Sequence, residues 1–353
     1  MYTFLADIHL GNKLSNVDQL KSLNLFLDLI KKHEEECHCI FVCGDLFDHR
    51  LTIEEAQFAS LFLLNLVCNN CGRNGRIHVP VHFIHGTYTH DYDQYEIFMP
   101  LLNRIDNTEV FYTKNTCDGK LRNGATVLYL PQIYGDGVEL EQYLKDKKYD
   151  IIVGHGPISS STKSPCKSTH HEIVHSTELL GNISNVCVFG HYHGYTDFGN
   201  NVYYAGPMLR WRYGEDEPRK FLICDDDFNV TTHENPFAIE YKTIEINDPE
   251  QLRDIISTKI ETPTRFIINP TDDDRETYHS IMMINKKNTN ITYQINQSID
   301  EKSDAVIEPD QSLPTIDNSI GPLESLVSYI SSKYNVDTSK EIQEYNDKIN
   351  KEC

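Results

Sequence analysis

Short apolar segments that end in polar, metal-binding side chains recur along this 353-residue chain and alternate with helical patterns. Cys39–Cys43 is apolar throughout and runs directly into Gly44-Asp45. Val17–Glu35 and Glu54–Val67 carry apolar residues at helical spacing. This alternation predicts an α/β layered core in which polar loops gather at the strand ends. The other predicted strands are Tyr2–Ala6, Val79–Ile84, Ala125–Leu130, Ile151–Val153, Val186–Phe189, Val202–Ala205 and Phe221–Cys224.

Four of these strand ends supply side chains that bind divalent cations. In Asp7-x-His9 and again in His191-x-His193, two residues of an extended segment are spaced so that both side chains point to the same side. Each motif alone is equally typical of a surface pair, a turn or a buried histidine, and the order of all four motifs favours a common site. The candidate metal ligands are Asp7, His9, Asp45, His155, His191 and His193.

These residue types indicate both the metal and the reaction. Imidazole and carboxylate ligands without thiolate favour Mn²⁺, Fe²⁺ or Zn²⁺ over Ca²⁺. Two such cations, about 3.5–4 Å apart, lower the pKa of a bridging water and stabilise charge on phosphoryl oxygens. The sequence therefore predicts two divalent cations and the hydrolysis of phosphate esters.

Composition limits the partners and the compartment. The formal net charge of −21 excludes a broad basic surface, although a local patch around cations could still hold an acidic polymer. No apolar stretch approaches the ~20 residues needed to span a bilayer, and the first residues lack a basic signal region. Ten cysteines without a secretory signal favour a cytoplasmic protein with buried free thiols. A zinc site that uses Cys37, Cys39, Cys68 and Cys71 is the less favoured alternative.

Changes in pattern divide the chain into four parts. Residues 1–235 form the α/β domain, and 236–296 form a small α+β unit with strands at Ile239–Ile246 and Arg265–Ile268 and helices at Pro249–Ser257 and Arg275–Ile281. Residues 297–321 are polar and acidic, which is typical of a flexible linker. Residues 322–353 contain two short amphipathic patterns that predict helices docking on their own domain or, preferably, on a partner.

The motifs resemble those of the calcineurin-like metallophosphoesterases. Ala6-Asp7-Ile8-His9-Leu10-Gly11 and Gly44-Asp45-Leu46-Phe47-Asp48 are similar in particular to SbcD-type DNA repair exonucleases, and the short tail is similar to that of phage members. The resemblance implies a metallophosphoesterase β-sandwich flanked by helices, a DNA-capping domain at 236–296 and a helical tail. It covers residues 1–225 by specific motifs and the capping domain only by position and size.

The resemblance also implies ligands, partners and a reaction. Asp7, His9, Asp45 and His193 would hold the first cation, and Asp45, His155 and His191 the second, with Mn²⁺ as the expected metal. The expected activity is cleavage of DNA, 3′ to 5′ from duplex ends or endonucleolytically, with an SbcC-type coiled-coil ATPase bound by the C-terminal helices. The compartment would be the cytoplasm, or the host cytoplasm for a virus. Whether the chain forms a homodimer is left undecided, because the apolar faces of Val17–Glu35 and Glu54–Val67 could pack in the core or against a second copy.

One motif departs from the family pattern Gly-Asn-His-Asp. The stretch reads Gly86-Thr87-Tyr88-Thr89-His90-Asp91, and anchoring it on His-Asp makes His90 the catalytic histidine and Thr89 the replacement for the asparagine ligand. Anchoring it on the glycine would use Thr87 and Tyr88 instead. We prefer the first alignment, because it keeps a proton donor, with Asp91 orienting His90. The competing functions are a phosphatase or phosphodiesterase for a non-DNA substrate and a non-catalytic scaffold of the same fold.

Overall fold

The computed structural model describes one compact unit, Met1–Asn296, apart from short gaps. The described residues are 1–12, 16–33, 36–68, 78–106, 108–135, 137–159, 172–215, 217–257, 260, 264–271, 274–284 and 291–295. The predicted linker 297–321 and the predicted helices at 322–353 lie outside them.

The first of two large sheets has the strand order β14-β13-β1-β2-β3-β4. Its parallel part consists of β1 (Tyr2–Leu5), β2 (Cys39–Cys43), β3 (Val81–Ile84) and β4 (Val110–Thr113). The antiparallel strands β13 (Lys220–Cys224) and β14 (Val230–Glu234) extend it beyond β1. Residues in β1, β2 and β3 are buried on both faces, as expected for parallel strands between two layers.

The second sheet has the order β11-β12-β10-β7-β6-β5. Parallel strands β12 (Val202–Tyr204), β10 (Ser184–Gly190), β7 (Tyr149–His155) and β6 (Thr126–Leu130) form its centre. The antiparallel strands β11 (Thr196–Asp197) and β5 (Cys117–Lys120) close its edges, and the short pair β8 (Ile158–Ser159) and β9 (His175–Ser176) lies apart from it.

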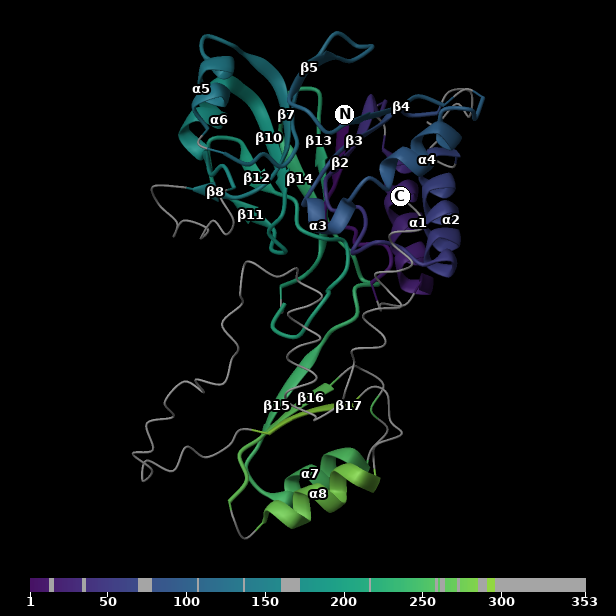
Figure 1. Ribbon diagram of the computed structural model, residues 1–353, viewed down its shortest axis with the longest axis vertical. Coiled ribbons are helices and arrows are strands. Elements are labelled where there is room, and N and C mark those ends of the chain that lie inside the picture. Colours follow the sequence, from purple (N-terminus) through teal and green to yellow (C-terminus); the bar gives the residue numbers. More distant parts are fainter. Residues whose placement is uncertain are drawn as a thin grey trace, which may run out of the picture. The chain divides into compact units, whose positions relative to one another are not determined.

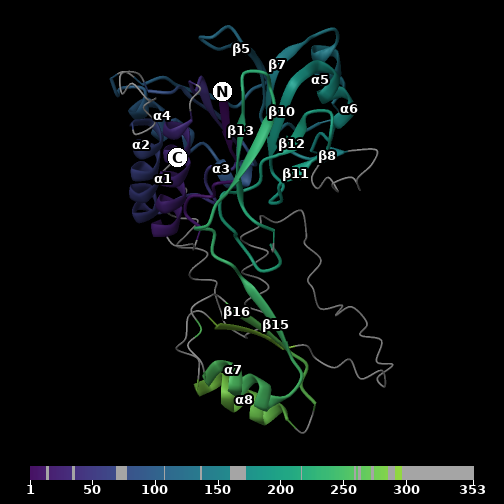
Figure 2. The same cartoon turned by 180° about the vertical axis from the view of Figure 1, so that it is seen from behind.

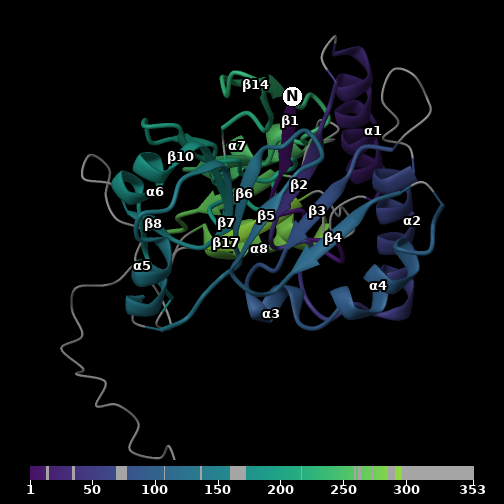
Figure 3. The same cartoon turned by 90° about the horizontal axis from the view of Figure 1, so that it is seen from above.

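Helices cover the outer faces of the two sheets (Figure 1, Figure 2). Helices α1 (Asn16–Lys32), α2 (Ile53–Cys68) and α4 (Tyr95–Leu102) lie over the first sheet, and α5 (Val138–Leu144) and α6 (Thr177–Ile183) over the second. Figure 3 shows both sheets between these two groups. One apolar cluster fills the space between the sheets, and one lies under each group of helices.

Residues 242–295 form a small α+β unit of their own. Its parallel strands β15 (Lys242–Ile246), β16 (Thr264–Ile268) and β17 (Ile291–Ile295) form a three-stranded sheet. Helices α7 (Pro249–Ser257) and α8 (Arg275–Ile284) pack on it around the buried side chains of Leu252, Phe266 and Tyr278.

The predicted mixed α/β fold is confirmed. The predicted helices and central strands agree with the structure to within a few residues, because their apolar spacing is regular. The apolar spacing did not predict the following elements, which are short or lie at sheet edges: α4, α5, α6, β4, β5, β14 and β17.

Two further expectations concern surfaces and thiols. The apolar faces of α1 and α2 pack into the core through residues such as Phe26 and Phe62, which leaves Leu61 and Leu64 of α2 exposed. Cys37 and Cys39 are buried free thiols. Cys71 lies outside the described residues. Among the helices that the structure describes, none is long and apolar enough to cross a membrane.

Candidate metal centre

The loops that follow the parallel strands of both sheets meet, and their backbone is sharply bent there. Asp7, His9, Asp45 and His191 all have positive φ angles, between 47° and 105°, which side-chain-bearing residues rarely adopt. Gly44 precedes Asp45 with a φ of 76°, and a Cβ at this position would lie inside the His155 imidazole. Strained backbone of this kind persists where the surrounding structure holds it, typically at functional sites.

The first group of ligand atoms joins Asp7, His9 and His193 within 4.8 Å of one another. The Nε2 atoms of His9 and His193 are 3.1 Å apart. Asp7 is fully buried and accepts a hydrogen bond from the backbone N–H of His191 through Oδ1. Its Oδ2 has no hydrogen-bond partner among the described residues. A buried carboxylate oxygen without a partner is costly unless a cation satisfies it.

The second group joins Asp7, Asp45 and His155. The Oδ1 of Asp45 is 3.3 Å from the Nε2 of His155 and accepts the backbone N–H of Thr87. Burial alone would raise the pKa of Asp45, but the adjacent imidazoles outweigh it and hold that pKa well below its usual range. Burial opposes the charge on His155 as well, yet Asp45 raises its pKa to about 9. Both shifts have the same cause, the attraction between the Asp45 carboxylate and the His155 imidazole.

His191 lies next to His155, but it belongs to none of the groups of ligand atoms within 4.8 Å of one another among the described residues. Its ring centroid is 5.3 Å from that of His155 at a steep angle. Burial, assisted by the neighbouring His155, lowers the pKa of His191 to about 4. The imidazole is therefore neutral near pH 7, which is the form that binds a metal.

Thr89 does not lie in the cluster, and the preference for it over Thr87 was wrong. Thr89 is exposed on the one-turn helix α3 (Tyr88–Asp91), whereas Thr87 directly precedes that helix in an extended conformation. The Oγ1 of Thr87 is 3.2 Å from Asp45 Oδ2 and 3.4 Å from His155 Nε2. The helical turn takes up the extra residues, so the threonine that directly follows Gly86 is the one that lies in the cluster. The assignment of His90 as the catalytic histidine stays a prediction.

His90 lies beside the first group of ligands. Its ring centroid is 4.8 Å from that of His9, and its Nδ1 donates to the backbone carbonyl of Asp48 at 2.6 Å. The expectation that Asp91 orients His90 is contradicted, because the Asp91 carboxylate accepts the backbone N–H groups of Phe47 and Gly86. Asp91 is buried, and burial together with the Asp45 charge raises its pKa to about 6. It holds the two ligand loops together.

Glu215 lies next to the cluster, although no motif of the sequence marks it. Its Oε1 is 3.1 Å from the Nδ1 of His193, and its Oε2 accepts from Arg219 and from the backbone N–H of Trp211, both at 2.7 Å. The Glu215 side chain is 8% exposed and that of Arg219 3%. An acidic residue in a polar stretch carries no mark of such a contact, because only the fold brings it to His193.

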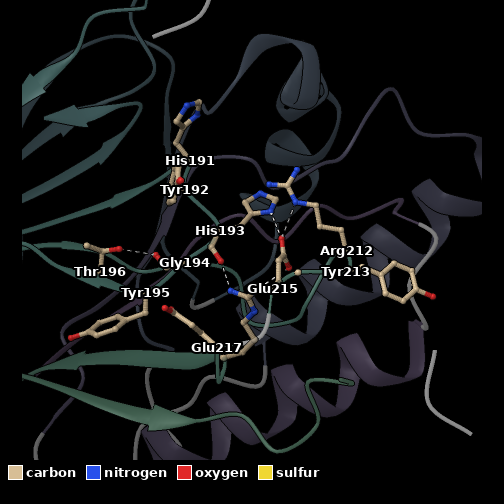
Figure 4. A pocket seen from close by; sticks show the side chains of 12 residues that line it. His191, Tyr192, His193, Gly194, Tyr195, Thr196, Arg212, Tyr213, Glu215 and Glu217 are labelled. Atoms are coloured by element: carbon tan, nitrogen blue, oxygen red, sulfur yellow. Dashed lines mark hydrogen bonds and ion pairs between the residues drawn. The ribbon is translucent and has the colours of Figure 1, made fainter. Parts of the chain in front are cut away.

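A cavity of about 590 Å³ opens next to His191 and His193. Figure 4 shows His193 and Arg212 directed toward Glu215 at its centre, with the Tyr195 and Tyr213 rings farther out. Arg212 is 76% exposed and could contact a substrate phosphate. Arg210 could not, because it is buried and donates to backbone carbonyls, including that of Ala238. Lys163 and Lys167 lie outside the described residues.

The residues present fit a pair of divalent cations. Nδ1 of His155 donates to the Cys43 carbonyl, and Nδ1 of His9 and of His193 each faces a carboxylate. Partners on the Nδ1 side leave Nε2 free as the ligand atom. The Nε2 atoms of His9 and His193 are 3.1 Å apart, and Nε2 of His155 is 3.3 Å from Asp45 Oδ1.

Comparison with known proteins agrees with this chemistry. The sequence model of the family described as Calcineurin-like phosphoesterase matches residues 2–195, which is more than half of the chain. No curated protein matches the sequence. Of 29 matching chains of solved structures, one crystal structure aligns over 66% of this chain and 98% of its own length, with 10% identity and a TM-score of 0.39.

Proposed function

This chain belongs to the calcineurin-like phosphoesterase family, whose members hydrolyse phosphate esters with bound metal ions, and we propose that it is a two-metal DNA nuclease. The observation that carries the proposal is the convergence of three groups of ligand atoms: Asp7 with His9 and His193, Asp7 with Asp45 and His155, and His90 with His9 and Asp48. Asp7, His9, Asp45 and His193 hold the first cation in this proposal; Asp45, His155 and His191 hold the second, with Thr87 in place of Thr89.

Each side chain has a separate task in the reaction. A bound pair of cations supplies an acidified water and stabilises charge on the phosphoryl oxygens. His90 donates a hydrogen bond from Nδ1 to the Asp48 carbonyl, so the protonated imidazole, which carries a second hydrogen on Nε2, is the form that can pass a proton to the leaving oxygen. Asp91 keeps the loop of His90 in register with that of Asp45 through its two backbone contacts.

A nucleic-acid substrate is supported by the cavity next to His193. Tyr192, Tyr195 and Tyr213 line it together with Arg212, and aromatic faces with a guanidinium group suit bases and phosphates. The resemblance to SbcD-type exonucleases in the first two motifs points the same way. Because the chain is acidic overall, the cations and Arg212 would provide the local positive charge that DNA requires.

The test is digestion of end-labelled duplex and hairpin DNA with Mn²⁺. We expect the wild type to degrade the DNA and both Asp45→Asn and His90→Ala to lose at least about 100-fold in rate. His233→Ala, which changes a histidine on the outer strand β14, is the control and keeps full activity. A wild type that cleaves a small phosphate ester but leaves all DNA intact would favour the non-DNA phosphatase, and a wild type that binds no metal would favour the scaffold.

We also keep two partners as proposals. Residues 322–353 would bind the coiled coil of an SbcC-type ATPase, and deletion of that segment should abolish stimulation by the ATPase while basal hydrolysis continues.

A homodimer would use the apolar residues that α2 and α4 leave exposed, Leu61, Leu64, Ile97 and Leu101. Light scattering of the wild type beside Leu61→Lys/Leu64→Lys tests it: a mass of one chain in both would exclude the dimer.

A further inference from the structure

We infer that Gln132 completes the second cation site. Its side-chain oxygen, together with the Thr87 hydroxyl, would take the place of the single asparagine ligand in the pattern Gly-Asn-His-Asp. The inference rests on the proposed two-metal function and specifies how this chain builds the weaker half of the site. Gln132 directly follows the loop at the end of β6, and its backbone N–H donates to the His85 carbonyl.

The distances place Gln132 within the shell of donors around Thr87. Thr87 Oγ1 is 3.1 Å from Gln132 Oε1, 3.2 Å from Asp45 Oδ2 and 3.4 Å from His155 Nε2. Oxygen ligands at about 2.1–2.2 Å from a common cation, at right angles, are separated by about 3 Å. The distances from Thr87 Oγ1 to Gln132 Oε1 and to Asp45 Oδ2 therefore match those between neighbouring ligands.

The amide of Gln132 is turned with its oxygen toward the cluster. On its other side, Nε2 donates to Glu172 Oε1 at 2.5 Å. An ionised carboxylate can only accept hydrogen bonds, so the NH₂ group must face Glu172 and the oxygen must face Thr87. Backbone contacts fix this arrangement, because Tyr134 pairs with Glu172 and the N–H of Ile173 donates to Ile133.

The Thr87 hydroxyl is shared between two acceptors. The Thr87 hydroxyl has one hydrogen and faces two oxygen acceptors, Asp45 Oδ2 and Gln132 Oε1. If the hydroxyl donates its hydrogen to one of these oxygens, the other oxygen faces a lone pair of Thr87 Oγ1. A divalent cation would be bound by all three oxygens together and would remove this conflict, as the amide oxygen of an asparagine does with a single residue.

The test counts Mn²⁺ on the full-length protein by calorimetry and by electron paramagnetic resonance, with no DNA present. The wild type should bind two Mn²⁺. Gln132→Ala and the near-isosteric Gln132→Met should keep the first and weaken the second at least about tenfold. The double variant Thr87→Asn/Gln132→Ala should regain it, because the new amide oxygen enters the same shell.

Two outcomes overturn the inference. If both Gln132 variants bind two Mn²⁺ with wild-type affinity, the amide is not a ligand. If the second Mn²⁺ is lost but Thr87→Asn does not restore it, Gln132 acts only by holding the loop. A wild type that binds two Mn²⁺ and leaves DNA uncut would instead contradict the nuclease proposal and leave the role of Gln132 standing.

Discussion

Thr87 and Thr89 differ by two positions and lie in opposite environments. Thr87 contacts Asp45 and His155, whereas Thr89 is exposed on α3. We expect Thr87→Ala to weaken the second Mn²⁺ about tenfold or more and Thr89→Ala to change nothing, in calorimetric titrations of the two variants side by side. The opposite result would support the alignment anchored on His-Asp, in which Thr89 replaces the asparagine ligand.

Glu215 acts on the metal only through His193. Removing the carboxylate from the Nδ1 side of a ligand histidine lowers metal affinity about 10–100-fold, so Glu215→Ala should bind the first Mn²⁺ that much more weakly. Glu215→Gln should lose less, because its amide oxygen still accepts from the imidazole. Glu217→Ala, in the same loop but exposed, is the matched control.

The same substitution reports on stability. Glu215 pairs with the buried Arg219, and breaking a buried pair costs about 3–5 kcal/mol. Chemical denaturation of the metal-free variants therefore separates a folding defect from a loss of metal. A Glu215→Ala protein with normal Mn²⁺ affinity would show that His193 needs no such partner.

At the scale of elements, the turn after β2 depends on Gly44. Its φ is 76° and an added Cβ would be 2.6 Å from His155 Cγ, whereas Gly199 has a φ of 79° and nothing within 4 Å of an added Cβ. Gly199→Ala should therefore cost only the backbone strain, about 1 kcal/mol, and Gly44→Ala about 3 kcal/mol or more. Equal losses in urea denaturation would mean that the crowding against His155 relaxes freely.

The two sheets bury a histidine that makes the fold sensitive to acid. His82 on β3 is 7% exposed, its Nδ1 is 2.6 Å from the Tyr129 hydroxyl, and burial lowers its pKa to about 4. In the unfolded chain the pKa of histidine is about 6.5, so the unfolded state binds more protons between these values. Neutral His82 therefore contributes to the free energy of unfolding in full above pH 6.5. This contribution is lost as the pH falls toward 4 and amounts to about 3 kcal/mol at most.

Urea denaturation between pH 7.5 and 4 measures this dependence. His175 contributes in the same direction, because burial lowers its pKa to about 4 as well. The double variant His82→Phe/Tyr129→Phe removes both polar partners together and should flatten part of the decline. An unchanged decline in that variant would assign the acid sensitivity to other groups.

For the whole molecule, bound cations should add to the stability of the first domain. The buried oxygen Asp7 Oδ2 has no partner among the described residues, and metal binding to the folded state alone stabilises it by about 2.7 kcal/mol per site at 100 times Kd. We expect Mn²⁺ to raise the unfolding temperature of the apoprotein and a chelator to reverse the change. Asp45→Asn should lose most of that increase, and an equal increase in Asp45→Asn would place the stabilising metal elsewhere.

The sequence by itself determined the layered α/β core and the residues of four motifs. Regular apolar spacing specifies α1, α2 and the central strands, because burial on one or both faces dictates where apolar residues fall. Chemistry that depends on residue type, such as His and Asp at strand ends, could therefore be predicted from the linear order.

Only the tertiary structure decided which other residues contact the side chains of these motifs. Thr87 replaced Thr89 because a single helical turn absorbs the extra residues of the loop. Gln132 and Glu215 reach the cluster from strand ends and loops far away in the chain, and neither carries a local pattern that marks it. Such contacts arise where the edges of two sheets meet. The periodic pattern of a strand or helix does not specify which residues from distant parts of the chain lie close together there.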